Sequence, residues 1–460
     1  MANVKIDLSK TQGKIKPMHA VNNGPSYTLG GHTGGWDKTA DLAKIRNGNI
    51  EEFKAAGIPF ARTHDSSFYS KYGLEHTIDV HAIFPDFDAD PDDPASYDFV
   101  CTDHYLDMIE GGGSKIFYRL GSRIEHEIKK YGTLVPKDYR KWAVICEHII
   151  RHCNEGWANG SHRNIEYWEI WNEPDLDADD AENKRTWSGT QEDFFAFYHV
   201  AATHLKQCFP HLKIGGPALA VHYNFAEKFL AQLKAPLDFF SWHIYAHDIE
   251  AIAARAARMR ELLDQNGFTK TESILNEWNY VQGWSGDDLI YSYIEQKKEK
   301  GAAFNLAAMC TCQHGSVDML MYYDARPCNW NGLFDFMQLG SVTTKAYYSF
   351  PAFNTLYALG SSVCCSSDDA NVYVCAAKNE HEAAFVVTHY NNDDNHAGTQ
   401  VTIDISGASF ANGTELEVYL LDGERDLTLV DSVIYYGDKI TLKRPLPNFT
   451  TYLIKLRERA

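Results

Sequence analysis

The sequence predicts a (β/α)8 TIM barrel joined to a smaller antiparallel β-sandwich, and three features of the chain support this fold class. Eight apolar segments of strand length recur between residues 17 and 324, with amphipathic segments of helical spacing between them. Beyond about residue 350 the pattern changes to short alternating runs separated by turns rich in Asp, Asn and Gly. The 460 residues suffice for a barrel of roughly 250 or more residues and a second domain.

The expected barrel strands are rich in apolar, aromatic and β-branched residues, as buried parallel strands are. They cover residues 17–23, 58–64, 115–121, 165–173, 212–218, 237–245, 272–278 and 317–324. Successive parallel strands with right-handed crossovers either close into a barrel or fan out as an open sheet. A nucleotide-binding open sheet carries a phosphate loop after a strand, whereas the glycine-rich segment 111–115 precedes one and lacks the Gly-Lys-Ser/Thr order. We therefore expect the eight strand–helix units to close.

Helices between these strands are indicated by their end signals. Asn49 with Glu52 predicts a capping box, and Gly57 predicts the end of the same helix. Thr190 with Asp193 predicts the start of a second helix. These signals fall between expected strands, which supports the alternation of strands and helices.

The last hundred residues predict the sandwich. Short strands are expected at residues 371–375, 384–390, 400–405, 415–421, 427–433 and 450–455. The alternating segment 3–8 is a further strand, and we expect it to join the sandwich because a lone strand before a barrel needs an edge to pair with. The expected domains are residues 15–350 for the catalytic barrel, and residues 1–14 with 351–460 for the sandwich.

Charge and composition restrict the partners of the chain. The formal net charge of −19 argues against a nucleic-acid surface, which needs clustered Lys and Arg. No apolar stretch reaches the ~20 residues of a membrane span, and residues 1–7 lack the apolar core of a signal peptide. The ten cysteines include no C-x-x-C pair, so buried free thiols are expected. We expect a cytoplasmic protein without nucleic-acid or membrane partners, and the sequence leaves a homo-oligomer open.

Two expected strands end on a glutamate. The segment 165–171 stops on Asn172-Glu173-Pro174, and proline keeps Glu173 extended at the strand end. The segment 272–278 carries Glu277 in the same way. By strand count these are the fourth and seventh strands, whose carboxyl ends face each other across the mouth of a barrel, where barrel enzymes place their chemistry. Two facing carboxyl groups are the requirement of glycosidic cleavage, so the pair predicts a glycosidase.

At these residues the sequence resembles the clan A glycoside hydrolases, because residues 171–174 (Trp-Asn-Glu-Pro) look like the acid/base motif of the clan. Family 39, which contains β-xylosidases and α-L-iduronidases, is the most similar family. Its resemblance spans roughly residues 60–350 and rests on residues 61–64, 97–99, 103–107, 117–122 and 345–348. The resemblance implies a retaining mechanism, with Glu173 as acid/base and Glu277 as nucleophile.

Further site residues are expected from their positions. Asn172, beside the acid, is placed to bond a sugar 2-hydroxyl. Arg62 is placed to lower the pKa of Glu277, with a buried structural ion pair as the alternative. His243 and Tyr245 end the sixth strand and are placed to keep the nucleophile ionised; a core histidine satisfied by backbone is the alternative for His243.

The remaining candidates line the expected mouth of the barrel. His64 follows the second strand, and Asp324 and Arg326 follow the eighth, where they are expected to bind sugar hydroxyls. Aromatic residues at the strand ends predict an apolar platform for the sugar face, and Trp278 or Trp330 is expected to contact the sugar.

The chain has twenty histidines, but we expect no metal and no cofactor. His148 and His152 lie four apart beside Glu147 without forming a His-Glu-x-x-His motif, and their helix is expected on the barrel exterior. The predicted function is a retaining glycoside hydrolase that acts on a plant- or host-derived oligosaccharide or glycoside by double displacement, exo-acting and β-xylosidase-like. The partner is a small carbohydrate substrate. A transglycosylase of the same mechanism and a non-catalytic carbohydrate-binding protein are the alternatives, and the sequence leaves the sugar and its linkage open.

Overall fold

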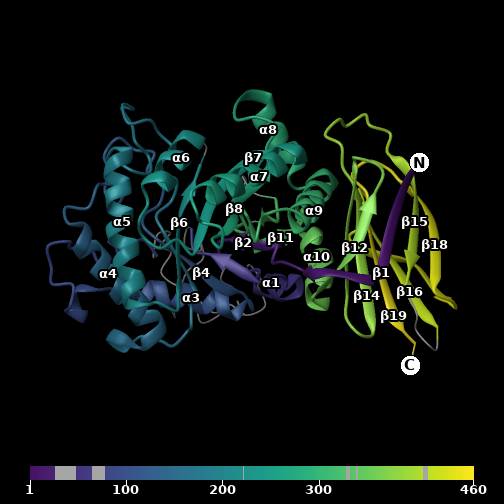
Figure 1. Cartoon of the computed structure of the whole chain (residues 1–460), viewed down its shortest axis with the longest axis horizontal. Coiled ribbons are helices and arrows are strands. Elements are labelled where there is room, and N and C mark those ends of the chain that lie inside the picture. The colour runs from purple at the N-terminus through teal and green to yellow at the C-terminus, as the bar shows by residue number, and fades with distance from the viewer. Residues whose placement is uncertain are drawn as a thin grey trace, which may run out of the picture.

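The computed structural model describes residues 1–25, 48–64, 78–220, 222–327, 332–337, 340–407 and 413–459. The molecule is elongated, with a barrel at one end and a β-sandwich at the other (Figure 1). Both parts follow from the sequence pattern, and the predicted fold class is confirmed.

Eight parallel strands close the barrel in the order in which they occur along the chain. They are β2 (Ala20–Asn22), β3 (Phe60–Arg62), β4 (Lys115–Leu120), β5 (Tyr167–Ile170), β6 (Lys213–Leu219), β7 (Phe239–Ala246), β8 (Glu272–Tyr280) and β9 (Met319–Tyr322). Ala20 of β2 pairs beside Met321 of β9 and so closes the circle. Each of the eight expected segments overlaps one of these strands, and β6, β7 and β8 run one or two residues beyond the expected end.

Aromatic and aliphatic side chains fill the interior of the barrel. They come from alternate positions on the strands and form one buried cluster: Ala20, Phe60, Phe117, Tyr167, Phe239, Ile274, Met319 and Met321. Because side chains alternate across a strand, the intervening residues point outward into the larger core beneath the helices. The next inward positions above this cluster carry polar groups, which form the floor of the site.

The helices cover the outside of the barrel and one side of the sandwich. They are α1 (Ile50–Ala56), α2 (Val80–Ile83), α3 (Val100–Gly111), α4 (Tyr139–Glu155), α5 (Gln191–Cys208), α6 (Tyr223–Gln232), α7 (Ile249–Gln265), α8 (Gly286–Glu295), α9 (Glu299–His314) and α10 (Ser349–Leu359), with the short 3-10 helices η3 (Pro94–Ser96), η4 (Trp157–Asn159) and η5 (Ala346–Tyr348). None of the helices in the described ranges is both long and apolar enough to cross a bilayer.

The expected helix ends agree with the structure at two of three places. Thr190 and Asp193 form the predicted capping box at the start of α5. Gly57 ends α1 with a φ of 57°, a left-handed conformation that glycine adopts without a steric penalty. The capping box at Asn49 is wrong, because that side chain makes no cap bond; its amide lies 3.5 Å from the Ala325 carbonyl oxygen instead.

The sandwich is built from one strongly curved nine-stranded sheet, in the order β17-β16-β19-β14-β13-β12-β1-β15-β18. Its strands are β1 (Ala2–Lys14), β12 (Ser361–Ser367), β13 (Val372–Lys378), β14 (Glu382–His389), β15 (Thr399–Ser406), β16 (Thr414–Leu421), β17 (Thr428–Tyr435), β18 (Lys439–Leu446) and β19 (Thr451–Glu458). The two ends of the sheet meet, since Arg444 of β18 forms an ion pair with Asp431 of β17. A small hairpin, β10 (Phe334–Met337) and β11 (Gly340–Thr343), stands apart.

The N-terminal strand joins the sandwich, as predicted. β1 pairs antiparallel with β12 and parallel with β15, which makes β1–β15 the exception to the antiparallel pattern. Its inward residues share one apolar core with the other strands. The first residues of the chain therefore pair with strands that lie about four hundred positions later.

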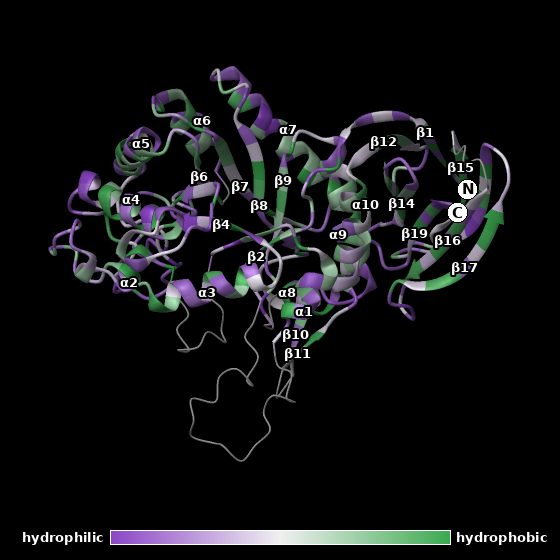
Figure 2. Cartoon of the chain, turned by 90° about the horizontal axis from the view of Figure 1, so that it is seen from below, coloured by the Kyte–Doolittle hydropathy of each residue, from purple (hydrophilic) through white to green (hydrophobic). Residues whose placement is uncertain are grey.

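Helices α9 and α10 connect the two parts of the molecule, and both lie between the barrel and the sandwich in Figures 1 and 2. His314 at the end of α9 bonds the Val374 carbonyl of β13 at 3.1 Å, and Lys300 forms an ion pair with Asp394 at 2.9 Å. The boundary after residue 350 stays a prediction, and α10 crosses it.

Candidate active site

Glu173 and Glu277 meet at the carboxyl ends of the barrel strands. Glu173 follows β5, and Glu277 lies in β8. One oxygen from each carboxyl group and one ring nitrogen of His243 all lie within 4.8 Å of one another. Both glutamates are buried, with 6% and 4% of their surfaces exposed. The structure thus brings the two predicted carboxylates together.

The chain takes a tight turn to place Glu173. Trp171 and Glu173 have φ angles of 74° and 50°, in the left-handed region that non-glycine residues avoid. Such positions cost on the order of 1–3 kcal/mol each and persist where the surroundings hold them. The Glu173 amide donates to the Ala218 carbonyl at 2.9 Å, and the Thr186 hydroxyl donates to the Glu173 carbonyl at 2.6 Å. These bonds fix the backbone and aim the carboxyl group inward.

A bulge in β8 places Glu277. Ile274 faces the barrel interior, so strict alternation would turn residues 276 and 278 inward and Glu277 outward. The pairing with β7 instead skips one residue of β8, because Trp242 pairs with Leu275 and His243 pairs with Glu277. The extra residue, Asn276, also faces inward and donates to Glu169 at 2.6 Å. The bulge therefore re-aims Glu277 into the mouth of the barrel.

Three donors surround Glu277. Arg62 Nη1 lies 2.8 Å and His64 Nε2 3.2 Å from Oε1, and the Tyr245 hydroxyl donates to Oε2 at 2.9 Å. Burial alone would raise the pKa of Glu277, but the His243 and His64 rings, the Arg62 charge and the Tyr245 bond outweigh burial and lower it to about 2. Burial lowers the pKa of His243 to about 4, so Arg62 is the lasting positive charge at neutral pH. Glu277 is therefore an ionised carboxylate at neutral pH.

Arg62 is the buried centre of the floor beneath the site. Its Nε donates to Glu169 at 2.6 Å, its Nη1 to Asn22 at 2.9 Å, and its Nη2 to Asn172 at 2.6 Å. Both sequence interpretations of Arg62 therefore describe a real contact, the structural ion pair with Glu169 and the bond to Glu277. The Asn172 Nδ2 has no hydrogen-bond partner among the described residues, which leaves this amide to donate into the cavity.

Glu173 lies in a different electrostatic environment. Burial and, next, the charge of Glu277 and that of Asp175 raise the pKa of Glu173 well above its ordinary value. Its Oε1 lies 2.8 Å from His243 Nδ1, which is also 3.5 Å from Glu277 Oε2. Because the pKa of His243 is low and that of Glu173 is raised, the proton of this contact belongs to the Glu173 carboxyl group at neutral pH. The two carboxyl groups thus differ in protonation: Glu173 holds a proton and Glu277 does not.

A cavity of about 650 Å³ opens above the pair. It is lined by His64, Ile124, His126, Glu173, Leu176, Arg185, Ala220, His243, Ile244, Tyr245, Arg255, Glu277, Trp284 and Tyr323. This volume is in the range of a site for one small organic ligand. Five of the predicted site residues line the cavity directly, and Arg62 and Asn172 lie beneath them. The five are His64, Glu173, His243, Tyr245 and Glu277.

The prediction for Trp278 is wrong. Its side chain is fully buried between the barrel and α9, with ring centroids 5.4 Å from Tyr322 and 6.1 Å from Phe304. The bulge at Asn276 is the cause, because it turns Glu277 inward and the next residue outward. Trp330 lies outside the described residues, so its contact with sugar stays a prediction.

Asp324 and Arg326 lie after β9, as expected, but they bind each other. The guanidinium Nη2 of Arg326 lies 3.0 Å from Asp324 Oδ2, and neither residue lines the cavity. Tyr323, which the sequence reasoning missed, lines it instead. Its signal was an aromatic residue directly after a strand, at the carboxyl end of the barrel, where Glu173 and Glu277 also lie.

The sequence reasoning also missed Trp284 and Arg255. Trp284 lies in the loop after β8, is 59% exposed, and packs edge-on against Tyr245 with ring centroids 5.3 Å apart. It offers the aromatic surface that Trp278 was expected to provide. Arg255 lies in α7, and no pattern in the sequence separates it from the other charges of that helix.

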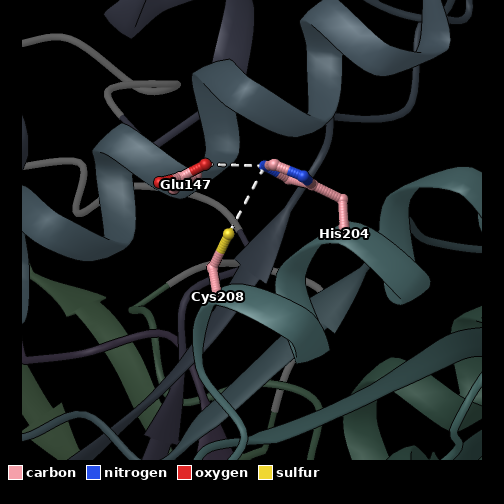
Figure 3. Close-up of side chains that lie close together, drawn as sticks. All are labelled: Glu147, His204 and Cys208. Carbon is pink, nitrogen blue, oxygen red and sulfur yellow. Dashed lines mark hydrogen bonds and ion pairs between the residues drawn. The ribbon is translucent and has the colours of Figure 1, made fainter.

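Two groups in the described residues have donor types that suit a metal ion. In the first, Glu173, His243 and Glu277, the Arg62 charge 2.8 Å from Glu277 opposes a cation. The second, Glu147, His204 and Cys208, lies between α4 and α5 on the barrel exterior (Figure 3). His204 Nε2 lies 2.7 Å from Glu147, whose other oxygen pairs with Arg151 at 2.8 Å. Because arginine already neutralises Glu147, we interpret this group as a tie between two outer helices.

A parallel eight-stranded barrel with a protonated and an ionised carboxyl group across its mouth is the arrangement that glycoside hydrolases use. The comparison with known families agrees. The model of glycosyl hydrolases family 39 matches residues 2–281, a span that includes both glutamates, and the chain belongs to this family.

Individual relatives are more distant. A β-xylosidase of Caldicellulosiruptor saccharolyticus is 29% identical over 164 residues, which are 34% of this chain and 32% of that protein. The match thus spans about a third of the relative's own length. The solved structure of a glucosidase from Croceicoccus marinus superimposes with a TM-score of 0.79 at 21% identity, covering 100% of this chain and 99% of the other. A monomeric β-xylosidase from Caulobacter crescentus gives 0.71 at 17% identity, with 100% of both chains covered. These structural likenesses show the fold.

Proposed function

We propose that the chain is a retaining glycosidase, exo-acting and β-xylosidase-like, that cleaves a plant- or host-derived glycoside by double displacement. One observation carries the proposal: oxygens of Glu173 and Glu277 lie within 4.8 Å. Retaining enzymes hold their carboxyl groups about 5–5.5 Å apart, whereas inverting enzymes need about 6.5–9.5 Å to admit a water molecule. The spacing therefore favours direct attack by a carboxylate.

In the first step Glu277 attacks the anomeric carbon and Glu173 protonates the leaving oxygen. The pKa of Glu277, about 2, keeps the attacking oxygen ionised. The raised pKa of Glu173 keeps its proton available at neutral pH. The C–O bond to the leaving group breaks as the ester bond to Glu277 forms.

In the second step Glu173, now ionised, takes a proton from water, which attacks the anomeric carbon and releases Glu277. Loss of the Glu277 charge in the ester removes one cause that raised the pKa of Glu173, so the residue becomes ready to act as base. The Nδ2 of Asn172, for which the described part of the chain offers no acceptor, is placed to donate to the sugar 2-hydroxyl in both steps. Tyr245, released from its bond to Glu277, can then bond the sugar.

The substrate class is inferred from the cavity and the relatives. A cavity of about 650 Å³ suits a terminal sugar and its leaving group rather than a long polymer, which supports exo action. A curated relative and a solved neighbour are β-xylosidases, which supports a xylose-like sugar.

The test is product analysis on a panel of aryl glycosides. We expect turnover of 4-nitrophenyl β-D-xyloside and related glycosides, and proton NMR of the first-formed sugar should show the β-anomer. The α-anomer as first product would contradict the retaining mechanism. Turnover of the panel by Glu277→Ala protein at the wild-type rate would remove the site assignment.

A further inference from the structure

Arg255 is a buried cation in the wall of the catalytic cavity, and it forms no ion pair with the residues that the structure describes. It lies in α7, is 8% exposed, and lines the same cavity as Glu173 and Glu277. Its Nη2 donates to the Ala220 carbonyl at 3.2 Å, and its Nε has no hydrogen-bond partner among the described residues. The guanidinium rests on the Tyr223 ring, 5.1 Å from its centroid.

The other buried arginines in the described ranges, Arg62 and Arg119, are neutralised. Arg62 pairs with Glu169 and Glu277, and Arg119 pairs with Asp79 at 2.8 Å. Arg185, which also lines the cavity, pairs with Asp177 at 2.7 Å. Removing a charge from water costs several kcal/mol unless a partner compensates it, and burial accordingly lowers the pKa of Arg255. The missing partner at Arg255 therefore requires an explanation.

Asp175 is the carboxylate whose charge acts on Arg255 from nearby, but both of its oxygens accept hydrogen bonds from the backbone. One of its oxygens accepts from the Ala220 amide at 2.8 Å, and the other accepts from the His222 amide at 2.9 Å. Asp175 is thus used to hold the loop after β6. The guanidinium edge of Arg255 stays available to the cavity.

Arg255 lies on the Glu173 side of the cavity. It contacts Ala220, and the same segment supplies the Ala218 carbonyl that accepts from the Glu173 amide at 2.9 Å. His64 and Tyr245, which also line the cavity, contact Glu277 instead. An acid must face the oxygen that it protonates, so the Glu173 side holds the leaving group.

We propose that Arg255 binds an oxyanion, a carboxylate, sulfate or phosphate, carried by the leaving-group part of the substrate. The planar fork of a guanidinium bonds such groups through two parallel N–H donors, and burial strengthens the pairing. The natural leaving group is then an acidic sugar or another acidic residue rather than a neutral one. This inference rests on the proposed glycosidase function and assigns the leaving-group specificity of that site.

The experiment compares two aryl β-D-xylosides that differ in one group, 4-carboxyphenyl and 4-carbamoylphenyl. For the wild-type enzyme kcat/KM should be higher for the acid, and Arg255→Met should reduce that preference roughly tenfold or more, as expected for loss of a charge-assisted hydrogen bond. Arg255→Lys, which keeps the charge but not the fork, should retain part of it. The control is Arg258→Met on the same helix, because Arg258 is only half-buried and pairs outside the cavity with Glu227 and Glu261. The 4-sulfophenyl and 4-phosphonophenyl xylosides then identify which oxyanion is preferred.

A structural role for Arg255 would lower both rates together and leave the acid-to-amide ratio unchanged. An unchanged ratio in folded Arg255→Met protein, or no preference for the acid in the wild-type enzyme, would overturn the proposal; the second result needs no variant. Absence of turnover on all aryl glycosides would contradict the proposed function instead. In that case calorimetric titration with 4-hydroxybenzoate still decides the anion site: binding that is at least tenfold weaker in Arg255→Met than in Arg258→Met supports it, and equal binding overturns it.

Discussion

Glu277 should control the proton on Glu173 through its charge. The two carboxyl groups have oxygens within 4.8 Å, and unit charges at that distance interact by about 3 kcal/mol at an effective dielectric of 20. Glu277→Gln removes the charge and keeps the shape, so the penalty on ionised Glu173 disappears. The pKa of Glu173 should then fall, because the Glu277 charge is the largest cause after burial that raises it.

The assay is a pH titration followed by NMR of protein labelled with carbon-13 at the glutamate side-chain carboxyls. Tyr245→Phe is the matched control: it removes a 2.9 Å bond to Glu277 but leaves the charge in place, so Glu173 should titrate near its wild-type midpoint. An unchanged Glu173 midpoint in Glu277→Gln would refute the reasoning. It would mean that burial alone sets the proton of the acid.

Three further predictions concern pH, the sugar contact and the core. Because Glu277 is ionised above about pH 2, kcat/KM should stay constant in weakly acidic buffer. It should fall as the pH rises through the raised pKa of Glu173, because the acid then loses its proton. A value of kcat/KM that also falls between pH 6 and pH 4 in folded protein would contradict the assignment of Glu277. Asn172→Ala should reduce kcat/KM for a xyloside by roughly tenfold or more, with a much smaller loss for the 2-deoxy analogue, because only the former has the hydroxyl that Asn172 bonds. Trp278→Ala should lower the free energy of unfolding by about 3–5 kcal/mol in urea titration, because its side chain is fully buried. At 15 °C, where the variant is folded, its KM should stay within about twofold of the wild-type value. A KM raised tenfold with unchanged stability would show instead that Trp278 contacts the sugar.

The barrel was readable from the sequence because each strand is a short apolar run between amphipathic helices. Closure followed from the order of the elements, and the pairing of β1 with the sandwich followed from the need of a lone strand for an edge. The two glutamates were readable for a related reason. A charged residue at the end of an apolar strand is accommodated most readily at the open end of the barrel.

The direction of single side chains was less predictable. A one-residue bulge at Asn276 reverses the inward and outward direction of every later side chain in β8. No residue type in that segment predicts the bulge. It turned Trp278 into the core and Glu277 into the site. The place of Arg255 in the cavity wall was unpredictable for another reason. In the sequence, a cation in an amphipathic helix cannot be told from a solvent-exposed charge, and only the packing of α7 against the loop after β6 shows that it is buried.

The azide reaction of Glu173→Ala protein tests the central claim most directly. Without its acid/base the enzyme should still form the ester with Glu277 from an activated aryl xyloside, but it should lack the base that activates water. Azide needs no base, so adding it should accelerate turnover and yield β-xylosyl azide, the product with retained configuration, which proton NMR identifies. An α-xylosyl azide, or no acceleration with equal losses on good and poor leaving groups, would contradict the assignment of Glu173 and Glu277 to a retaining double displacement.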